Sequence, residues 1–162
     1  MDAASAPVAR HHSLTLERVD AGSVGELTDF LRDVDLTLSA LAEPSVRLWI
    51  ERDHAGRVVG STGYELRAEG GDALIRSVAV HPAQRTRGRG RALAEHAIAA
   101  AREEGARRAW LFSRRSGPFW QSLGFVAADR DELVARLSET HQVSLFVRTG
   151  QIEREVAWTR PL

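Results

Sequence analysis

The sequence predicts a single α/β domain built on a mixed β-sheet, and two observations support this fold class. An apolar segment rich in β-branched residues, 74–80, leads through a glycine-rich turn into an amphipathic helix over 88–104. A second apolar segment, 107–112, follows that helix, and the right-handed crossover rule places it parallel to the first strand. The 162 residues are enough for one domain with its own hydrophobic core.

The composition excludes several functional classes. Lysine plus arginine and aspartate plus glutamate each number 22, so the zero net charge gives no general attraction to nucleic acid or membranes. The chain has no cysteine, which removes disulfides, thiolate metal sites and a cysteine acyl-enzyme. It has neither an apolar run of membrane-spanning length nor the pattern of a signal peptide. We therefore expect a cytoplasmic protein without a metal site.

The first third of the chain predicts strands and helices that lead into the 74–80 strand. Residues 1–12 are small and polar and predict a disordered tail, so the domain is expected over 13–162. Ser23 with Glu26 three residues later has the pattern of a capping box at the start of a helix. The predicted elements are a strand over 13–19, a helix over 23–34, a short helix over 36–42 and strands over 46–51 and 58–66.

The last third of the chain predicts a helical segment before the closing strand. A short helix is expected over 116–123 and a strand over 125–127. An additional helix over 131–138 precedes an apolar run at 143–147, and a final strand is expected over 155–159.

The turn after the 74–80 strand has the residues of an anion-binding site. It reads Arg85-x-x-Gly88-x-Gly90 and stands directly before a helix. The first N–H groups of a helix have no helical acceptor, and glycines let the backbone approach a phosphate closely. A solvated basic loop and a nucleic-acid contact are the two alternatives, and the zero net charge argues against nucleic acid.

These residues resemble a known family. The order V-x-V-x-P, then R-x-x-G-x-G, then a long helix resembles motif A of the GNAT superfamily, the acetyl-CoA-dependent N-acetyltransferases. Residues 119–125, FWQSLGF, are similar to the family's FYEKLGF segment. More narrowly, Gly63-x-Glu65 followed by LIRSVAV and a helical C-terminal tail resembles GNAT proteins associated with arsenic-resistance operons.

The resemblance implies the GNAT fold, in which a largely antiparallel sheet holds a central parallel strand pair and has helices on both faces. It implies acetyl-CoA as co-substrate, with the pantetheine arm between the parting 74–80 and 107–112 strands. A backbone N–H near Val78 would then receive the oxyanion. The implied cofactor contacts are Val78, Ala79, Val80, Arg85, Thr86, Arg87, Gly88, Arg89, Gly90, Arg91, Ala92, Ser113 and Phe119.

Two residues are candidates for catalysis, Glu65 and Ser77. Acetyl transfer needs a neutral amine, and a lysine-like amine is neutral only about once in 2,500 at pH 7, so a general base matters for such an acceptor. Glu65 is the candidate base, and the only tyrosine, Tyr64, should point to the opposite face of its strand. Trp120 stands where the family often has a tyrosine that protonates the leaving thiolate, and an indole cannot serve as that acid.

The sequence thus predicts an N-acetyltransferase that transfers acetyl directly to the primary amine of a small, amino-acid-like acceptor. The alternative is a catalytically weak GNAT domain that binds acyl-CoA as a sensor or interaction module, which Trp120 favours. No nucleic-acid or membrane partner is expected, and a homodimer is left open. The segment 129–153, longer than in a compact family member, would cover the active site or form a dimer surface.

Overall fold

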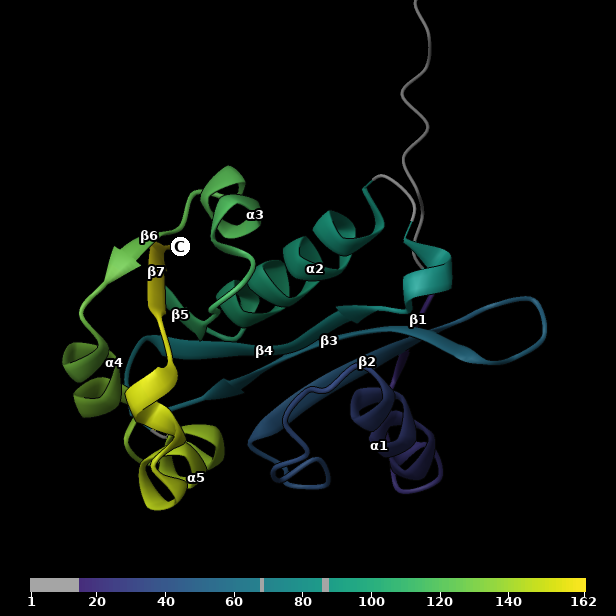
Figure 1. Cartoon of the computed structure of the whole chain (residues 1–162), viewed down its shortest axis with the longest axis horizontal. Coiled ribbons are helices and arrows are strands. Elements are labelled where there is room, and N and C mark those ends of the chain that lie inside the picture. The colour runs from purple at the N-terminus through teal and green to yellow at the C-terminus, as the bar shows by residue number, and fades with distance from the viewer. Residues whose placement is uncertain (1–14, 68, 86–87) are drawn as a thin grey trace, which may run out of the picture.

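The computed structural model describes residues 15–67, 69–85 and 88–162 (Figure 1). Within these residues, seven strands form one sheet. The strand order is β1-β2-β3-β4-β5-β7-β6. The β4–β5 pair is parallel and the other described pairs are antiparallel, as the sequence predicted. The strands are β1 (Leu16–Arg18), β2 (Val46–Arg52), β3 (Val58–Leu66), β4 (Asp72–Val80), β5 (Arg108–Phe112), β6 (Val126–Ala128) and β7 (Ala157–Pro161).

Helices cover both faces of this sheet (Figure 1). The helices α2 (Arg89–Glu103) and α3 (Gly117–Ser122) pack on one face. The other face carries α1 (Val24–Asp33), α4 (Arg130–Leu137) and α5 (His141–Thr149). Two short 3₁₀ helices, η1 (Pro82–Gln84) and η2 (Gln151–Arg154), complete the described elements. No helix in the described ranges is long and apolar enough to span a membrane.

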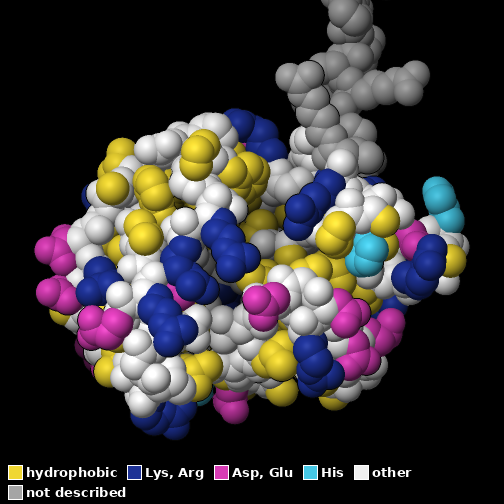
Figure 2. All heavy atoms as spheres, in the orientation of Figure 1, with side chains coloured by type: hydrophobic (Ala, Val, Ile, Leu, Met, Phe, Trp, Pro, Cys, Tyr) yellow, Lys and Arg dark blue, Asp and Glu magenta, His cyan; other side chains and the backbone are white. Residues whose placement is uncertain are grey.

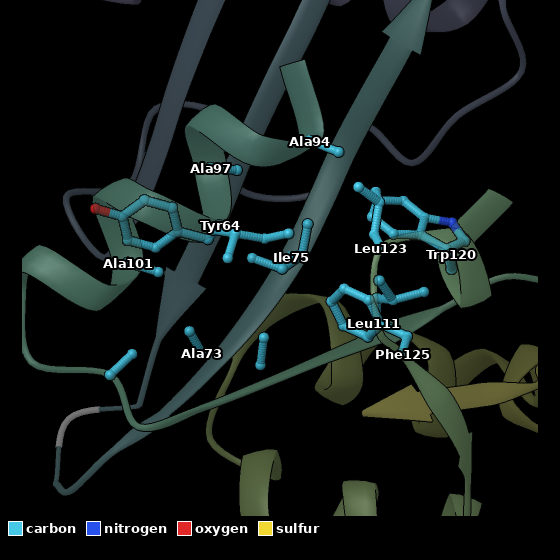
Figure 3. Close-up of a cluster of buried hydrophobic side chains, with 13 residues drawn as sticks. Tyr64, Ala73, Ile75, Ala94, Ala97, Ala101, Leu111, Trp120, Leu123 and Phe125 are labelled. Atoms are coloured by element: carbon cyan, nitrogen blue, oxygen red, sulfur yellow. The ribbon is translucent and has the colours of Figure 1, made fainter. Parts of the chain in front are cut away.

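The contact between α2 and the sheet consists largely of small residues (Figure 3). Ala94, Ala97 and Ala101 of α2 are fully buried against β3 and β4, where Tyr64 and Ile75 face them. Because alanine side chains are small, the helix axis can approach the sheet closely, and the close-packed interface then has no room for larger side chains. After Glu104, Gly105 ends the helix with φ of 100°, as expected for the residue that follows a helix cap. This packing holds the N-terminus of α2 against β4.

Two apolar clusters hold the helices of the opposite face. Leu27, Phe30 and Leu31 of α1 pack on β2. Leu133 and Leu137 of α4 and Val143 of α5 surround Leu74 and Trp110 of the parallel pair. The segment 129–153 is therefore part of the core under β4 and β5 and contributes a second helix, α5, where the sequence showed only an apolar run at 143–147.

Three sequence predictions of local structure are wrong. The short helix expected over 36–42 is absent, because Ala40 within it takes a left-handed φ of 56° and Asp35 just before it a left-handed φ of 58°. Ser23 precedes α1 as its N-cap, but its hydroxyl bonds Asp20 and caps no helical N–H. The closing strand begins at Ala157, two residues later than expected. The predicted tail, 1–12, lies outside the described residues.

Candidate functional site

The strands β4 and β5 part along their length. Their pairing covers Asp72–Leu74 opposite Arg108–Trp110. Beyond Leu74, β4 continues for six residues to Val80, whereas β5 ends at Phe112 and is paired on its far side with β7. Within the described residues, the edge of β4 from Ile75 onwards therefore has no strand partner on the β5 side.

Backbone N–H groups of β4 point into the gap that this leaves. The N–H of His81 donates to the carbonyl of Val59 on β3 at 2.8 Å. Because N–H directions alternate along a strand, the N–H of Ala79 also points toward β3. The N–H groups of Val78 and Val80 then point to the other side, into the gap. Val78 and Val80 thus offer donors at the place where the resemblance put the pantetheine arm and the thioester.

A β-bulge marks the middle of this open edge. The register between β3 and β4 shifts between Ser61 and Gly63, so that β4 carries one extra residue. Ser77 takes a φ of 59°, which is strained for a residue with a side chain. The bulge lies directly before Val78, so it determines how the Val78 N–H is aimed.

The N-terminus of α2 closes one end of the gap. Gly88 precedes the helix with a left-handed φ of 91°, and the first intrahelical bond runs from Ala92 N–H to the Gly88 carbonyl at 3.0 Å. The N–H groups of Arg89, Gly90 and Arg91 are consequently left without a helical acceptor. A side chain at Gly90 would meet Val80 Cγ2 at 3.8 Å and Phe119 Cζ at 3.9 Å. The three predicted residues Val80, Gly90 and Phe119 therefore meet at the mouth of the gap.

The arginines of this turn differ in what they contact. Arg89 turns away from the gap, because its guanidinium pairs with Glu51 on β2 at 3.4 Å and donates to Gln84 Oε1 at 3.3 Å. Arg91 pairs with Glu95 one turn along the helix at 3.0 Å. Arg85 is exposed. Thr86 and Arg87, both predicted to bind the cofactor, lie outside the described residues. In the described part of the turn, backbone N–H groups rather than arginine side chains line the gap.

Glu65 and Arg76 form a buried ion pair on the face that carries α1 and α5. Glu65 is 1% exposed, its Oε2 lies 3.4 Å from Arg76 Nη1, and it also accepts the N–H groups of His141 and Gln142 at the start of α5. Arg76 donates to the Ser39 carbonyl at 2.6 Å. Burial lowers the pKa of Arg76, while the charge of Glu65 opposes this shift. The pair thus links β3, β4, α5 and the loop after α1.

The structure also locates the groups considered for protonating a thiolate. Tyr64 lies on the α2 face of the sheet, opposite to Glu65 as predicted, and its hydroxyl donates to Glu104. Burial, and to a smaller extent this hydrogen bond, raises the pKa of Tyr64. Trp120 is buried between Phe119 and Phe125, with ring centroids 5.0 and 5.4 Å away. It therefore packs in the core of the α3 region.

Two serines are closer to the gap. Ser113 follows β5, and its hydroxyl accepts the Ser116 N–H at 3.1 Å in a local turn. The Ser77 hydroxyl lies 3.4 Å from Arg76 Nε, which has only a proton to donate, so the hydroxyl keeps its own proton for another acceptor.

Other features of the surface do not coincide with the gap. A cavity of about 400 Å³ lies between α1, the β2–β3 turn and η1. Three of its carboxylates, Glu26, Asp29 and Asp53, already pair with arginines. Figure 2 shows basic and acidic side chains interspersed over one face of the molecule. Among the described residues, no group of three or more histidines and carboxylates could hold a metal ion.

The sequence did not single out Arg76, which pairs with Glu65, or Ser61, whose hydroxyl donates to the Ser77 carbonyl. Arg76 had a visible signal, since an arginine within the apolar run LIRSVAV needs a buried partner. Ser61 had no such signal, because serine is common in strands and the contact of Ser61 with Ser77 depends on a β-bulge that no local sequence pattern predicts.

Comparisons with known proteins agree with this geometry. A model of the acetyltransferase (GNAT) family matches residues 13–125, about two thirds of the chain. No curated protein sequence matches the chain. The narrower likeness to arsenic-resistance proteins finds no support in these comparisons.

Solved structures share the fold at low identity. N-acetylglutamate synthase from Neisseria gonorrhoeae, complexed with coenzyme A and N-acetyl-glutamate, has a TM-score of 0.68 at 21% identity. The match covers 91% of this chain but only 35% of the synthase, so the chain spans about a third of that protein. The Mycobacterium tuberculosis protein Rv2747, in complex with CoA, has a TM-score of 0.69 at 19% identity, covering 91% of this chain and 98% of that one. A GNAT acetyltransferase from Staphylococcus aureus Mu50 has a TM-score of 0.67 at 13% identity, covering 91% and 99%.

Proposed function

Because the chain belongs to the GNAT acetyltransferase family, whose co-substrate is acetyl-CoA, we propose that it transfers acetyl directly to the primary amine of a small, amino-acid-like acceptor. One domain over 13–162 would carry the activity. The observation that carries the proposal is the open edge of β4, where the Val78 and Val80 N–H groups point into a gap bounded by the N-terminus of α2. The absence of cysteine from the sequence supports direct transfer over a covalent thioester intermediate.

Acetyl-CoA would bind along this gap. Its pantetheine amides would pair with the backbone of Val78, Ala79 and Val80 as an added strand does. Its diphosphate would accept the free N–H groups of Arg89, Gly90 and Arg91 at the positive end of the helix dipole. Phe119 and Ala92 would line the entrance, and Ser113 would approach from the β5 side. Arg85, with Thr86 and Arg87, would meet the outer phosphates.

The reaction then follows from groups around Val78. The amine nitrogen attacks the thioester carbon, and the carbonyl oxygen takes the negative charge next to the Val78 N–H. The carbon–sulfur bond breaks, the amide forms, and the thiolate leaves with a thiol pKa near 8.5. The Ser77 hydroxyl accepts a hydrogen bond from Arg76 and keeps its own proton, so it is the candidate hydrogen-bond donor to that thiolate, which then takes its proton from water.

The amine must lose a proton, and Glu65 is the candidate acceptor for it. On β3, Glu65 lies two residues after Gly63, and Gly63 is opposite Arg76 on β4. The Glu65 side chain lies on the face of the sheet where α5 and the loop after α1 meet. Arg76 and the α5 N–H groups occupy its oxygens, so the transfer would run through water that reaches this pair. Replacing Glu65 by Gln tests the role: kcat/KM for a lysine-like amine should fall at pH 7 and recover as the pH approaches the amine pKa of about 10.4. An unchanged pH profile would exclude Glu65 as the base.

The amino-acid-like acceptor draws support from one structural relative. The Neisseria gonorrhoeae synthase is complexed with N-acetyl-glutamate, an N-acetylated amino acid. The present chain shares its fold over 91% of its own length. A homodimer and a cytoplasmic location stay predictions from the sequence.

A second function has an observation in its favour. The only tyrosine, Tyr64, donates to Glu104 on the α2 face, and Trp120 packs in the core, so neither reaches the gap as an acid. A domain of this kind would bind acyl-CoA as a sensor without efficient turnover.

Calorimetry and a thiol-release assay separate the two functions. The enzyme binds both acetyl-CoA and CoA and releases thiol with at least one amine in a panel of amino acids, polyamines and peptides. A sensor binds both but releases no thiol above the uncatalysed rate with any amine. A folded, monodisperse sample that binds neither coenzyme contradicts both functions.

A further inference from the structure

The bulge in β4 has a specific support on β3. Two residue pairs frame the bulge, Ser61 opposite Ala79 and Gly63 opposite Arg76, so Thr62 faces two residues of β4 instead of one. The extra residue breaks the ladder at this point, and the Ser77 carbonyl would be left without a regular partner on β3. A partly buried carbonyl without a hydrogen-bond donor is costly, so the bulge needs a donor from elsewhere.

Ser61 supplies this donor. Its hydroxyl donates to the Ser77 carbonyl at 2.6 Å, and Ser61 is fully buried. The contact joins residues 16 positions apart, so it is a tertiary contact and not a local turn. It also stabilises the strained left-handed conformation of Ser77.

The planarity of the peptide bond connects this contact to the gap. A trans peptide holds its C=O and N–H in one plane, pointing in opposite directions. No cis peptide occurs in the described chain, so this applies to the Ser77–Val78 peptide. Its carbonyl points toward the Ser61 hydroxyl on β3, and therefore its N–H, which belongs to Val78, points away from β3 into the gap.

We infer that Ser61 is a positioning residue for acetyl transfer, whose hydroxyl fixes the Ser77–Val78 peptide plane and thereby aims the Val78 N–H at the thioester carbonyl. The inference rests on the proposed function of the gap. Preorganisation of this kind matters because an oxyanion donor acts only when its direction is set before the charge develops. Without the Ser61 hydroxyl, the peptide plane can rotate, and the donor loses its alignment although Val78 itself is unchanged.

Infrared difference spectroscopy tests the inference directly. Acetyl-CoA labelled with carbon-13 at the thioester carbonyl is added to the full chain, and the carbonyl stretch is compared with that of free acetyl-CoA. A hydrogen bond from Val78 moves this stretch to lower frequency in the wild type. The variant Ser61→Ala should lose most of the shift while binding acetyl-CoA, by calorimetry, within about twofold of the wild type. Its kcat should fall by about ten- to a hundredfold, the usual scale for a misplaced oxyanion donor.

Thr62 offers a matched control on the same strand. Its hydroxyl is also fully buried and donates to a backbone carbonyl, that of Leu93, at 2.7 Å, but on the α2 face. Thr62→Val therefore removes an equivalent side-chain hydrogen bond, which runs to α2 and not to β4, and keeps the Thr62 backbone opposite the bulge unchanged. Both variants should lose similar thermal stability, whereas the infrared shift and kcat should stay near wild type in Thr62→Val.

The outcomes keep this inference distinct from the proposed function. A wild-type protein that binds acetyl-CoA without any infrared shift contradicts the oxyanion role of the gap itself. A wild-type shift that persists in Ser61→Ala overturns the role of Ser61 and leaves the proposed function standing. Equal loss of the shift in both variants also overturns it, because the effect would then be general loosening of β3.

Discussion

The two faces of the sheet hold the site in different ways. On the α2 face, Ala94, Ala97 and Ala101 are fully buried against β3 and β4, and this close contact sets where the N-terminus of α2 lies. On the opposite face, two polar contacts occur next to the gap: the buried pair of Glu65 with Arg76, and the partly buried hydrogen bond from Ser61 to Ser77. Apolar packing has no preferred direction, whereas hydrogen bonds have one. The comparison indicates that the apolar face sets the position of the glycine-rich turn before α2 and the polar face sets the orientation of backbone groups of β4.

The largest expected effect comes from breaking the buried pair on the polar face. Arg76→Met leaves the Glu65 carboxylate buried without its cation, so the free energy of unfolding should fall by about 3–5 kcal/mol. Urea denaturation followed by circular dichroism measures this. The double variant Glu65→Gln/Arg76→Met should regain much of the loss, since no unpaired charge remains. Arg32→Met, which breaks the exposed pair with Asp29, should change little, and an equal loss there would contradict the comparison.

A smaller effect is expected from overfilling the apolar face. Ala97 is fully buried against the sheet, so Ala97→Leu should lower the free energy of unfolding by about 1–3 kcal/mol. It should also weaken CoA binding, because the larger side chain pushes α2 and its N-terminal N–H groups away from β4. Denaturation and calorimetry with CoA measure the two effects. Ala99 is exposed on the same helix, so Ala99→Leu should leave the free energy of unfolding and the affinity for CoA unchanged. If CoA binds Ala97→Leu as tightly as wild type, α2 packing does not position the turn.

The smallest expected effect is a pH dependence on the apolar face. His96 of α2 sets its ring edge-on to Trp49 with centroids 4.7 Å apart, and burial lowers its pKa, while the charge of Glu103 opposes the shift. The folded state therefore binds the proton less readily than the unfolded chain. Stability should be full above the unfolded pKa near 6.5 and should decrease as the pH falls from there to the lowered folded pKa. His96→Gln should flatten this part of the stability profile, measured by denaturation between pH 5 and pH 7.5, and a profile that keeps its slope would exclude His96 as the cause.

Much of the fold was predictable because it follows from local periodicity. A parallel strand pair with a helical crossover is predicted by two apolar runs, 74–80 and 107–112, and by the alanine-rich helix between them. The elements β4, α2 and β5 occupy those positions. The prediction of a helix over 36–42 is wrong because Arg76, far away in the sequence, binds the Ser39 carbonyl and because left-handed residues interrupt the segment. The sequence shows α5 only as an apolar run, because the groups that cap the N-terminus of this helix belong to Glu65, 76 residues earlier.

The sequence by itself determined the order of the strands along the chain, the glycine-rich turn and the family, because each of these depends on residues that are neighbours along the chain. Only the tertiary structure decided which backbone N–H groups are free in the gap, that Arg89 pairs with Glu51, and that Ser61 contacts Ser77. These features depend on where strands part and where one strand carries an extra residue. The position of the extra residue depends on strand pairing and on buried polar contacts across the whole sheet. The residues that make these interactions are far apart along the chain, so no short stretch of sequence contains all of them.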